Sequence, residues 1–221
     1  MNDNHSIGFI GYGNMGDAIG RSLINSGKAS EINVVESNDD RIEWIGKHRP
    51  DVTVVSLDQL LERSQIIFLA IKPQQFSELA PKLNGHIMSN QIIISMMAGI
   101  SIAAISNLIG HDGIVRIMPN TPASLTQGVT GIYSSDVIPV DQQEYIQSLC
   151  SSFGLVVNLD DESDIHAITA LSGSGPAFFY RMVDAFILFA RDQNIPDSVA
   201  KNLVIQTMVG AGAMLVETPD P

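Results

Sequence analysis

The stretch Gly11-Tyr12-Gly13-Asn14-Met15-Gly16 decides the fold of this 221-residue chain. It directly follows the apolar run Ile7–Ile10 and leads into a helical pattern that begins at Asp17. In a Gly-x-Gly-x-x-Gly loop between a strand and a helix, the first glycine permits a tight turn. The second lets backbone amides approach a pyrophosphate, and the third lets helix and strand pack closely. We therefore predict a dinucleotide-binding unit whose helix N-terminus faces the phosphates of a nicotinamide cofactor.

Short apolar runs alternate with helical stretches over the first 160 residues. The predicted strands are Ile7–Ile10, Ile32–Val35, Ile66–Ile71, Ile92–Met96, Ile114–Met118, Gly131–Tyr133 and Leu155–Leu159. The predicted helices are Asp17–Ser26, Asp39–Lys47, Leu57–Arg63, Phe76–Leu83, Ile102–Leu108 and Asp141–Leu149. This alternation predicts a Rossmann-type, doubly wound α/β domain over residues 1–160. Its first five strands are apolar enough to be buried on both faces.

Two long helices, Phe178–Gln193 and Asp197–Glu217, dominate residues 161–221, which contain no further predicted strand. Asp197 or Ser198 is the predicted N-cap of the second helix. Both helices carry Ala, Met, Val and Phe on more than one face, and a helix of that kind must be buried. One small domain cannot cover both helices, so we predict an all-helical C-terminal domain that is buried against a second subunit.

Composition narrows the class of protein. The formal net charge of −12 and the pI near 4.6 argue against binding to nucleic acid or to an anionic membrane surface, because both need a Lys/Arg footprint. Cys150 is the only cysteine, which fits a reducing compartment, and we expect it to be buried. Met1–Ser6 lacks the features of a signal peptide, and no run reaches the roughly 18 apolar residues of a membrane span. We therefore predict a cytoplasmic protein.

Glu36 ends the second predicted strand, twenty residues after Gly16. A carboxylate at this position accepts hydrogen bonds from the adenosine ribose and repels a 2′-phosphate, which favours NAD. Two other interpretations stay open. Ser37, Asn38 and Arg41 bind a phosphate if the loop turns Glu36 away, or Glu36 is simply a solvated acid. The residues therefore predict NADH or NADPH as cofactor without deciding between them.

Four further segments go beyond a generic dinucleotide-binding domain. They are Leu69-Ala70-Ile71-Lys72-Pro73-Gln74, Met97-Ala98-Gly99-Ile100-Ser101, Val115-Arg116-Ile117-Met118-Pro119-Asn120-Thr121-Pro122-Ala123 and Ala170-Leu171-Ser172-Gly173-Ser174-Gly175-Pro176-Ala177. In this order and spacing the chain resembles the pyrroline-5-carboxylate reductases from Ile7 to its end. The resemblance implies hydride transfer from NADPH or NADH to Δ1-pyrroline-5-carboxylate, giving L-proline in the last step of proline biosynthesis. It also implies a C-terminal helical domain that interlocks in a homodimer or a larger homo-oligomer.

The glycine motif and the resemblance together assign roles to residues near the predicted strand ends. The cofactor-binding candidates are Gly11, Tyr12, Gly13, Asn14, Met15, Gly16, Glu36, Ser37, Asn38, Ala70, Lys72, Pro73, Ala98, Gly99, Asn120 and Thr121. The candidates on the substrate side are Met118, Pro119, Ser172, Gly173, Ser174 and Gly175. Three plain alternatives stay open: a solvated loop lysine for Lys72, a structural turn for Met118–Pro122, and a close crossing of small residues for Ser172–Gly175.

No residue is an obvious acid or base for the reaction. His5, His48, His86 and His111 lie in the terminus or in loops, where we expect surface side chains, and no His/Cys cluster has the spacing of a metal site. Orienting the nicotinamide against a protonated iminium carries most of such a reaction.

The end of the chain departs from the family pattern. The chain stops at Thr218-Pro219-Asp220-Pro221, before the Ser-Pro-Gly-Gly-Thr loop of the family, so we expect a truncated C-terminal domain and an incomplete substrate site. A β-hydroxyacid-type dehydrogenase is one alternative function. Dehydrogenases of that class use a catalytic lysine one helical turn beyond a glycine-rich segment. The function is disfavoured here because no lysine follows Gly175 within one helical turn. The other alternative is a catalytically impaired, cofactor-binding fragment.

Overall fold

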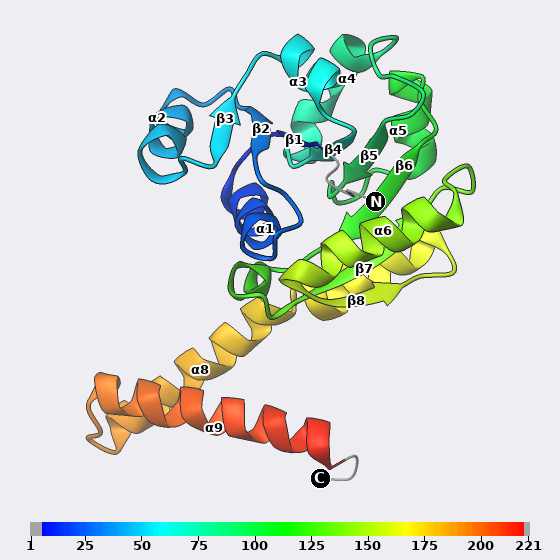
Figure 1. Ribbon diagram of the computed structural model, residues 1–221. Coiled ribbons are helices and arrows are strands. Elements are labelled where there is room, and N and C mark those ends of the chain that lie inside the picture. The colour runs from blue at the N-terminus through cyan, green and yellow to red at the C-terminus, as the bar shows by residue number, and fades with distance from the viewer. Residues whose placement is uncertain (1–5, 219–221) are drawn as a thin grey trace. The chain divides into compact units, whose positions relative to one another are not determined.

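A computed structural model describes residues 6–218, which leaves His5 outside the described chain. The chain forms two compact units, residues 6–173 and residues 174–218 (Figure 1). The first unit runs well past residue 160, where we predicted the domain boundary. It does so because Glu162 forms an ion pair with Arg116 and Ile165 is completely buried.

The first unit is built on one eight-stranded sheet with the order β3-β2-β1-β4-β5-β6-β7-β8. Strands β1 to β6 are parallel, β7 is antiparallel to β6, and β8 is parallel to β7. The strands are β1 Ile7–Ile10, β2 Ile32–Val35, β3 Val52–Val54, β4 Ile66–Leu69, β5 Ile92–Ser95, β6 Ile114–Met118, β7 Gly128–Ser134 and β8 Gly154–Asn158. The doubly wound sheet is confirmed, and its strand order reverses between β1 and β4, where such folds bind their ligands.

Helices pack on both faces of this sheet (Figure 1). They are α1 Asn14–Asn25, α2 Asp39–His48, α3 Leu57–Arg63, α4 Phe76–Leu83, α5 Ile102–Ile109, α6 Val140–Cys150 and the short α7 Ile165–Ile168. Successive strand residues point to opposite faces, so Phe9 packs into the core beneath α1 and α6 while Ile10 packs into the core beneath α3, α4 and α5. The first five predicted strands are buried on both faces, as their continuous apolar runs indicated.

Several boundaries differ from the prediction. Strand β3 was missed because it has three residues, two of them exposed at the sheet edge. Helix α1 begins at Asn14 rather than Asp17, with Gly13 as its N-cap. Strand β7 begins at Gly128 rather than Gly131 and includes the fully buried Thr130, a polar residue that broke the predicted apolar run. Cys150 is fully buried, as expected, and burial raises the pKa of its thiol to about 12.

The second unit is a hairpin of two long helices, α8 Gly175–Asp192 and α9 Asp197–Glu217. Pro196 holds the N-cap position of α9, so the prediction of Asp197 or Ser198 was wrong. Asp197 is engaged instead with the α8 side chain Arg191, whose Nε donates to its Oδ1 at 2.8 Å. Only Gly175 and Ala190 of α8 and Ala200 of α9 are buried. Among residues 6–218, α9 alone is long and apolar enough to cross a membrane by length and composition.

Candidate cofactor site

The glycine-rich loop joins β1 to α1 at the carboxyl edge of the sheet. Gly11 has a φ of +84°, and a Cβ there would lie 2.8 Å from the Ala70 carbonyl oxygen, so the turn against β4 requires glycine. A Cβ on Gly13 would meet no atom within 4 Å, so the loop is open at that point. No side chain caps α1, and its first-turn amides therefore remain available to an anion.

Tyr12 anchors this loop to the core. Its side chain is completely buried and packs edge-on against Phe9, with ring centroids 5.5 Å apart. The absence of a side chain at Gly20 leaves the space that the Tyr12 hydroxyl occupies. Burial raises the pKa of Tyr12, so the phenol stays neutral. The Tyr12 side chain therefore belongs to the core and is not offered to a ligand.

The half-buried Glu36 is fixed by the same loop. Its Oε2 accepts a hydrogen bond from the Tyr12 amide at 2.9 Å, and its Oε1 accepts from the amides of Ser37 and Asn38 at 2.8 and 3.0 Å. The loop does not turn Glu36 away, and the interpretation as a merely solvated acid does not fit these contacts. The side chain of Asn38 is used as the N-cap of α2, where its Oδ1 accepts from the Arg41 amide at 2.8 Å.

A cavity of about 400 Å³ opens beside the loop, at the carboxyl ends of β1, β2 and β4. Seven of the predicted cofactor-binding residues line it: Gly11, Tyr12, Gly13, Glu36, Ser37, Ala70 and Lys72. Its further lining residues, which the sequence analysis did not single out as cofactor contacts, are Ile10, Val35, Leu57, Ile71, Gln75, Glu78, Leu79 and Lys82. Apolar side chains beside the glycine-rich loop fit the adenosine end of a dinucleotide.

The remaining candidates follow β5 and β6. Ala98 and Gly99 are exposed after β5, and Met118, Pro119 and Asn120 are buried while Thr121 is exposed. Asn120 joins two of the predicted segments, because its Nδ2 donates to the Ser172 carbonyl oxygen at 3.0 Å and its Oδ1 accepts from the Val129 amide at 2.8 Å. Both ends of the Asn120 amide are thus bonded within the protein, which fits a structural turn as well as a cofactor contact.

The segment Ser172–Gly175 spans the division between the two units. Ser172 and Gly173 end a π-helical turn over Thr169–Gly173, and the Ser172 hydroxyl donates to the Ile168 carbonyl oxygen at 3.0 Å. Gly173 lies close to Met118, since a Cβ there would be 3.8 Å from Met118 Cγ. Ser174 and Gly175 begin the second unit, and α8 begins at Gly175 rather than Phe178, with Pro176 in its first turn.

Sequence reasoning missed a buried ion pair near these segments. Arg116 is 2% exposed, and its Nη1 donates to Glu162 Oε1 at 2.8 Å. The same carboxylate oxygen accepts from the Ile102 amide at the start of α5 at 2.7 Å. Glu162 therefore ties β6, α5 and the segment leading to Ser172 together. One arginine in the otherwise apolar strand Ile114–Met118 was the available signal, since a buried guanidinium requires a partner.

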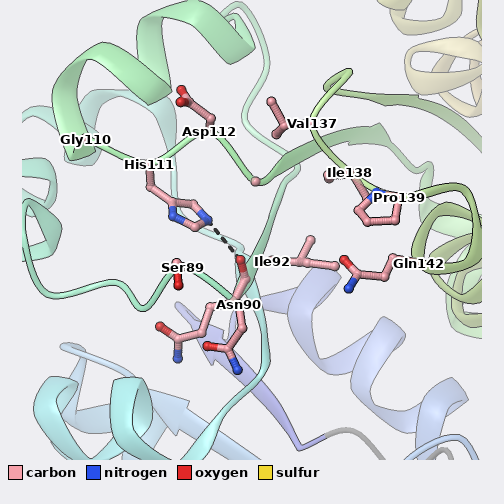
Figure 2. A pocket seen from close by; sticks show the side chains of 12 residues that line it. Ser89, Asn90, Ile92, Gly110, His111, Asp112, Val137, Ile138, Pro139 and Gln142 are labelled. Atoms are coloured by element: carbon pink, nitrogen blue, oxygen red, sulfur yellow. Dashed lines mark hydrogen bonds between the residues drawn. The ribbon is translucent and has the colours of Figure 1, made fainter.

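A second cavity, of about 490 Å³, lies at the opposite edge of the sheet (Figure 2). Ser89–Ile92 and Gly110–Gly113, which lead into the amino ends of β5 and β6, form most of its lining. His111 lines it and is 9% exposed, with Nε2 2.9 Å from the Gln91 carbonyl oxygen, so the expectation of a surface histidine was wrong. Doubly wound folds bind ligands at the carboxyl ends of their strands, and we therefore assign the cofactor to the first cavity.

Family models cover both parts of the chain. One described as NADP oxidoreductase, coenzyme F420-dependent, matches residues 6–99. One described as pyrroline-5-carboxylate reductase dimerisation matches residues 162–221. Among solved structures, a 1-pyrroline-5-carboxylate reductase from Streptococcus pyogenes is 28% identical with a TM-score of 0.89, over 100% of this chain and 83% of that one. A pyrroline carboxylate reductase from Plasmodium falciparum, solved with NADP bound, has a TM-score of 0.88 at 24% identity, over 99% and 81%.

Sequence relatives decide the family. The pyrroline-5-carboxylate reductase of Haemophilus influenzae is 34% identical over 215 residues, which are 96% of this chain and 79% of that protein. The enzyme of the same name from Pasteurella multocida is 32% identical over 220 residues, 97% of this chain and 80% of that protein. The predicted resemblance is confirmed: the chain belongs to the pyrroline-5-carboxylate reductase family.

Proposed function

We propose that the protein reduces Δ1-pyrroline-5-carboxylate to L-proline with NADH or NADPH, the last step of proline biosynthesis. The observation that carries the proposal is the open, uncapped Gly11–Gly16 loop at the switch point of a sheet in a chain of this family. The relatives named as pyrroline-5-carboxylate reductases and the related structure solved with NADP bound support it.

The chemistry asks little of the protein beyond orientation. The cofactor supplies a hydride to the ring carbon of the C=N bond, and the nitrogen carries the proton of the iminium, so one hydride and one proton complete the amine. In our proposal the Gly13 loop and the amino end of α1 hold the pyrophosphate, and Glu36 holds the adenosine ribose. Asn14, Met15, Gly16, Ser37, Asn38 and Pro73 complete the predicted surroundings of the dinucleotide.

We place the nicotinamide near the ends of β5 and β6. Ala98 and Gly99 leave room for a planar ring, and Asn120 with Thr121 positions the carboxamide. Met118, Pro119 and Ser172–Gly175 lie on the substrate side in this proposal, and Lys72 lies with the cofactor, whose cavity it lines. The hydrogen bond from Asn120 to Ser172 supports this grouping, because it joins the cofactor-side and substrate-side segments.

We further propose that the protein is a cytoplasmic homodimer or a larger homo-oligomer. The exposed apolar residues of the hairpin support this: Phe178, Phe179, Tyr180, Met182, Phe186, Leu188 and Phe189 on α8, and Val199, Leu203, Ile205, Val209, Met214, Leu215 and Val216 on α9. A second copy of the chain would cover these side chains and exclude water from them. The dimerisation model that matches residues 162–221 supports the predicted assignment of residues 161–221 to a helical dimerisation domain.

The test is an assay of the purified chain with Δ1-pyrroline-5-carboxylate and either reduced nucleotide. We expect substrate-dependent loss of the absorbance of the reduced nicotinamide and formation of proline. A 3-hydroxyacid with the oxidised nucleotide should give no turnover. Binding of the nucleotide without reduction of the imine would reject the reductase in favour of a cofactor-binding fragment, and turnover of the hydroxyacid would favour the dehydrogenase alternative.

A further inference from the structure

The carboxylate of Glu36 is held in one place by three backbone amides. One comes from the glycine-rich loop, at Tyr12, and two come from the start of the next loop, at Ser37 and Asn38. Hydrogen bonds from amides to a carboxylate are charge-assisted and fix its position. Glu36 therefore places a negative charge in the lining of the cavity, where the adenosine end of a dinucleotide lies in a doubly wound fold.

Most of the groups beside Glu36 that could hold a 2′-phosphate already have partners within the chain. Glu36 occupies the amides of Ser37 and Asn38, and the Asn38 side chain caps α2. The nearby cation, Arg41, donates from Nε to the Tyr12 carbonyl oxygen at 2.6 Å, and its guanidinium carbon lies 3.9 Å from the ring centroid of Trp44. Arg41 is thus turned toward the backbone of the loop and stacked on an aromatic ring.

The other charged side chains that line the cavity offset one another. Lys72 and Lys82 line it, and Glu78 lies four residues before Lys82 on α4. Two ammonium groups and two carboxylates, Glu36 included, leave the cavity without a net positive charge. A dianionic 2′-phosphate is therefore not attracted by the cavity as a whole, and the fixed carboxylate next to it decides the preference.

From these contacts we infer that Glu36 makes this chain selective for NADH over NADPH. Its carboxylate accepts hydrogen bonds from the adenosine ribose hydroxyls of NADH, and it repels the 2′-phosphate of NADPH. This inference rests on the proposed cofactor site but not on the identity of the substrate. It also separates this chain from the Plasmodium falciparum relative that was solved with NADP.

The experiment compares the dissociation constants of NADH and NADPH for the full chain. Trp44 is the only tryptophan and stacks on Arg41 beside the loop, so energy transfer from it to the reduced nicotinamide reports both ligands. We expect NADH to bind about 10- to 100-fold more tightly than NADPH. E36Q should bring the ratio of the two constants to within about threefold of one, mainly by tightening NADPH.

Two further variants test whether E36Q acts through the lost charge or through a change in the shape of the loop. E36D keeps the charge and should keep the preference for NADH. E43Q removes one carboxylate of the same α2 region, an exposed one paired with Lys47, and should leave the ratio within about twofold of wild type. Thermal unfolding of each variant shows whether it is folded.

The outcomes separate this inference from the proposed function. Equal binding of both nucleotides, tighter binding of NADPH, or an E36Q ratio equal to that of wild type overturns the inference and leaves the reductase standing. Selective binding of NADH without reduction of the imine supports the inference and overturns the reductase. Failure of both nucleotides to bind the folded wild type overturns both.

Discussion

The sheet unit and the helical hairpin carry similar apolar side chains, but they place them differently. In the sheet unit, successive strand residues alternate between two helix layers, and Phe9, Ile10, Phe68 and Leu69 are all nearly or completely buried. In the hairpin, Phe186 and Phe189 are 51% and 62% exposed. The first unit therefore closes its core with its own chain, whereas the second needs another surface to cover it.

The largest expected effect is on that second surface. F186D together with F189D should dissociate the proposed dimer, because a buried aromatic contact contributes about 2 kcal/mol or more and two of them raise the dissociation constant about a thousandfold. Light scattering should report half the wild-type mass, with the nucleotide still bound by the sheet unit. The matched control is L108D, which charges a singly exposed leucine of α5 and should leave the mass unchanged. A monomeric wild type would contradict the claim that another surface covers the hairpin.

The second effect sharpens the claim that the sheet unit is closed by its own contacts. E162Q leaves the buried Arg116 without its counter-ion and should lower the free energy of unfolding by about 3 kcal/mol. Urea unfolding measures the loss. Adding R116M in the E162Q background should recover most of the lost free energy of unfolding, because no unpaired guanidinium is then left buried.

The control for this ion pair is an exposed one. Glu43 and Lys47 of α2 form an ion pair in which both side chains are 64% exposed, and E43Q should leave the unfolding curve unchanged. If E162Q behaves like E43Q, then Glu162 does not tie β6 to the segment that follows it, and the sheet unit ends earlier than Gly173.

Local patterns explain what the sequence could predict. The glycine loop and the apolar strands depend on residues that are close together in the chain, and β1, β2 and β6 have the predicted bounds. The hydrogen bond of Asn120 to Ser172 and the ion pair of Arg116 with Glu162 join residues 52 and 46 positions apart. No periodicity records such contacts, and the short edge strand Val52–Val54 has too few apolar residues to stand out.

The sequence also identified candidates whose side chains have another task. Tyr12 stands in the glycine motif, but its ring belongs to the core, and Asn38 stands after Glu36, but its amide caps a helix. Position in a motif indicates which backbone reaches the ligand. It does not reveal whether the side chain is free, because that depends on neighbours from other elements.

The third prediction separates two glycines of one loop. G11A should destabilise the sheet unit by about 2 kcal/mol, because a positive φ and a close contact with Ala70 both oppose a Cβ. G13A should leave the stability unchanged and weaken nucleotide binding at least about tenfold, since the new methyl group stands between the amides and the pyrophosphate. Thermal unfolding and the nucleotide titration measure the two effects. G46A, on the exposed side of α2 with open space around it, should change neither the dissociation constant of NADH nor that of NADPH.

The smallest effect concerns the charges that join α1 to β3 in the sheet unit. Arg49 is bonded to Asp17 and, through Nε and Nη2, to both carboxylate oxygens of Asp51 at 3.0 and 2.6 Å. Its hydrogen bonds hold the pKa of Asp51 below the ordinary value of 3.8. A depressed folded pKa contributes stability that is complete above the unfolded pKa and is lost as the pH falls through the folded one.

D51N should therefore cost about 1 kcal/mol at pH 7, a modest loss because Arg49 keeps Asp17 as its partner. The difference between D51N and wild type should shrink only below pH 3.8, as the wild-type carboxyl takes up its proton. Urea unfolding at neutral and at acidic pH measures it. A difference that persists unchanged into strong acid would mean that Asp51 acts through its shape rather than its charge. In that case the sheet unit would be closed here by packing alone.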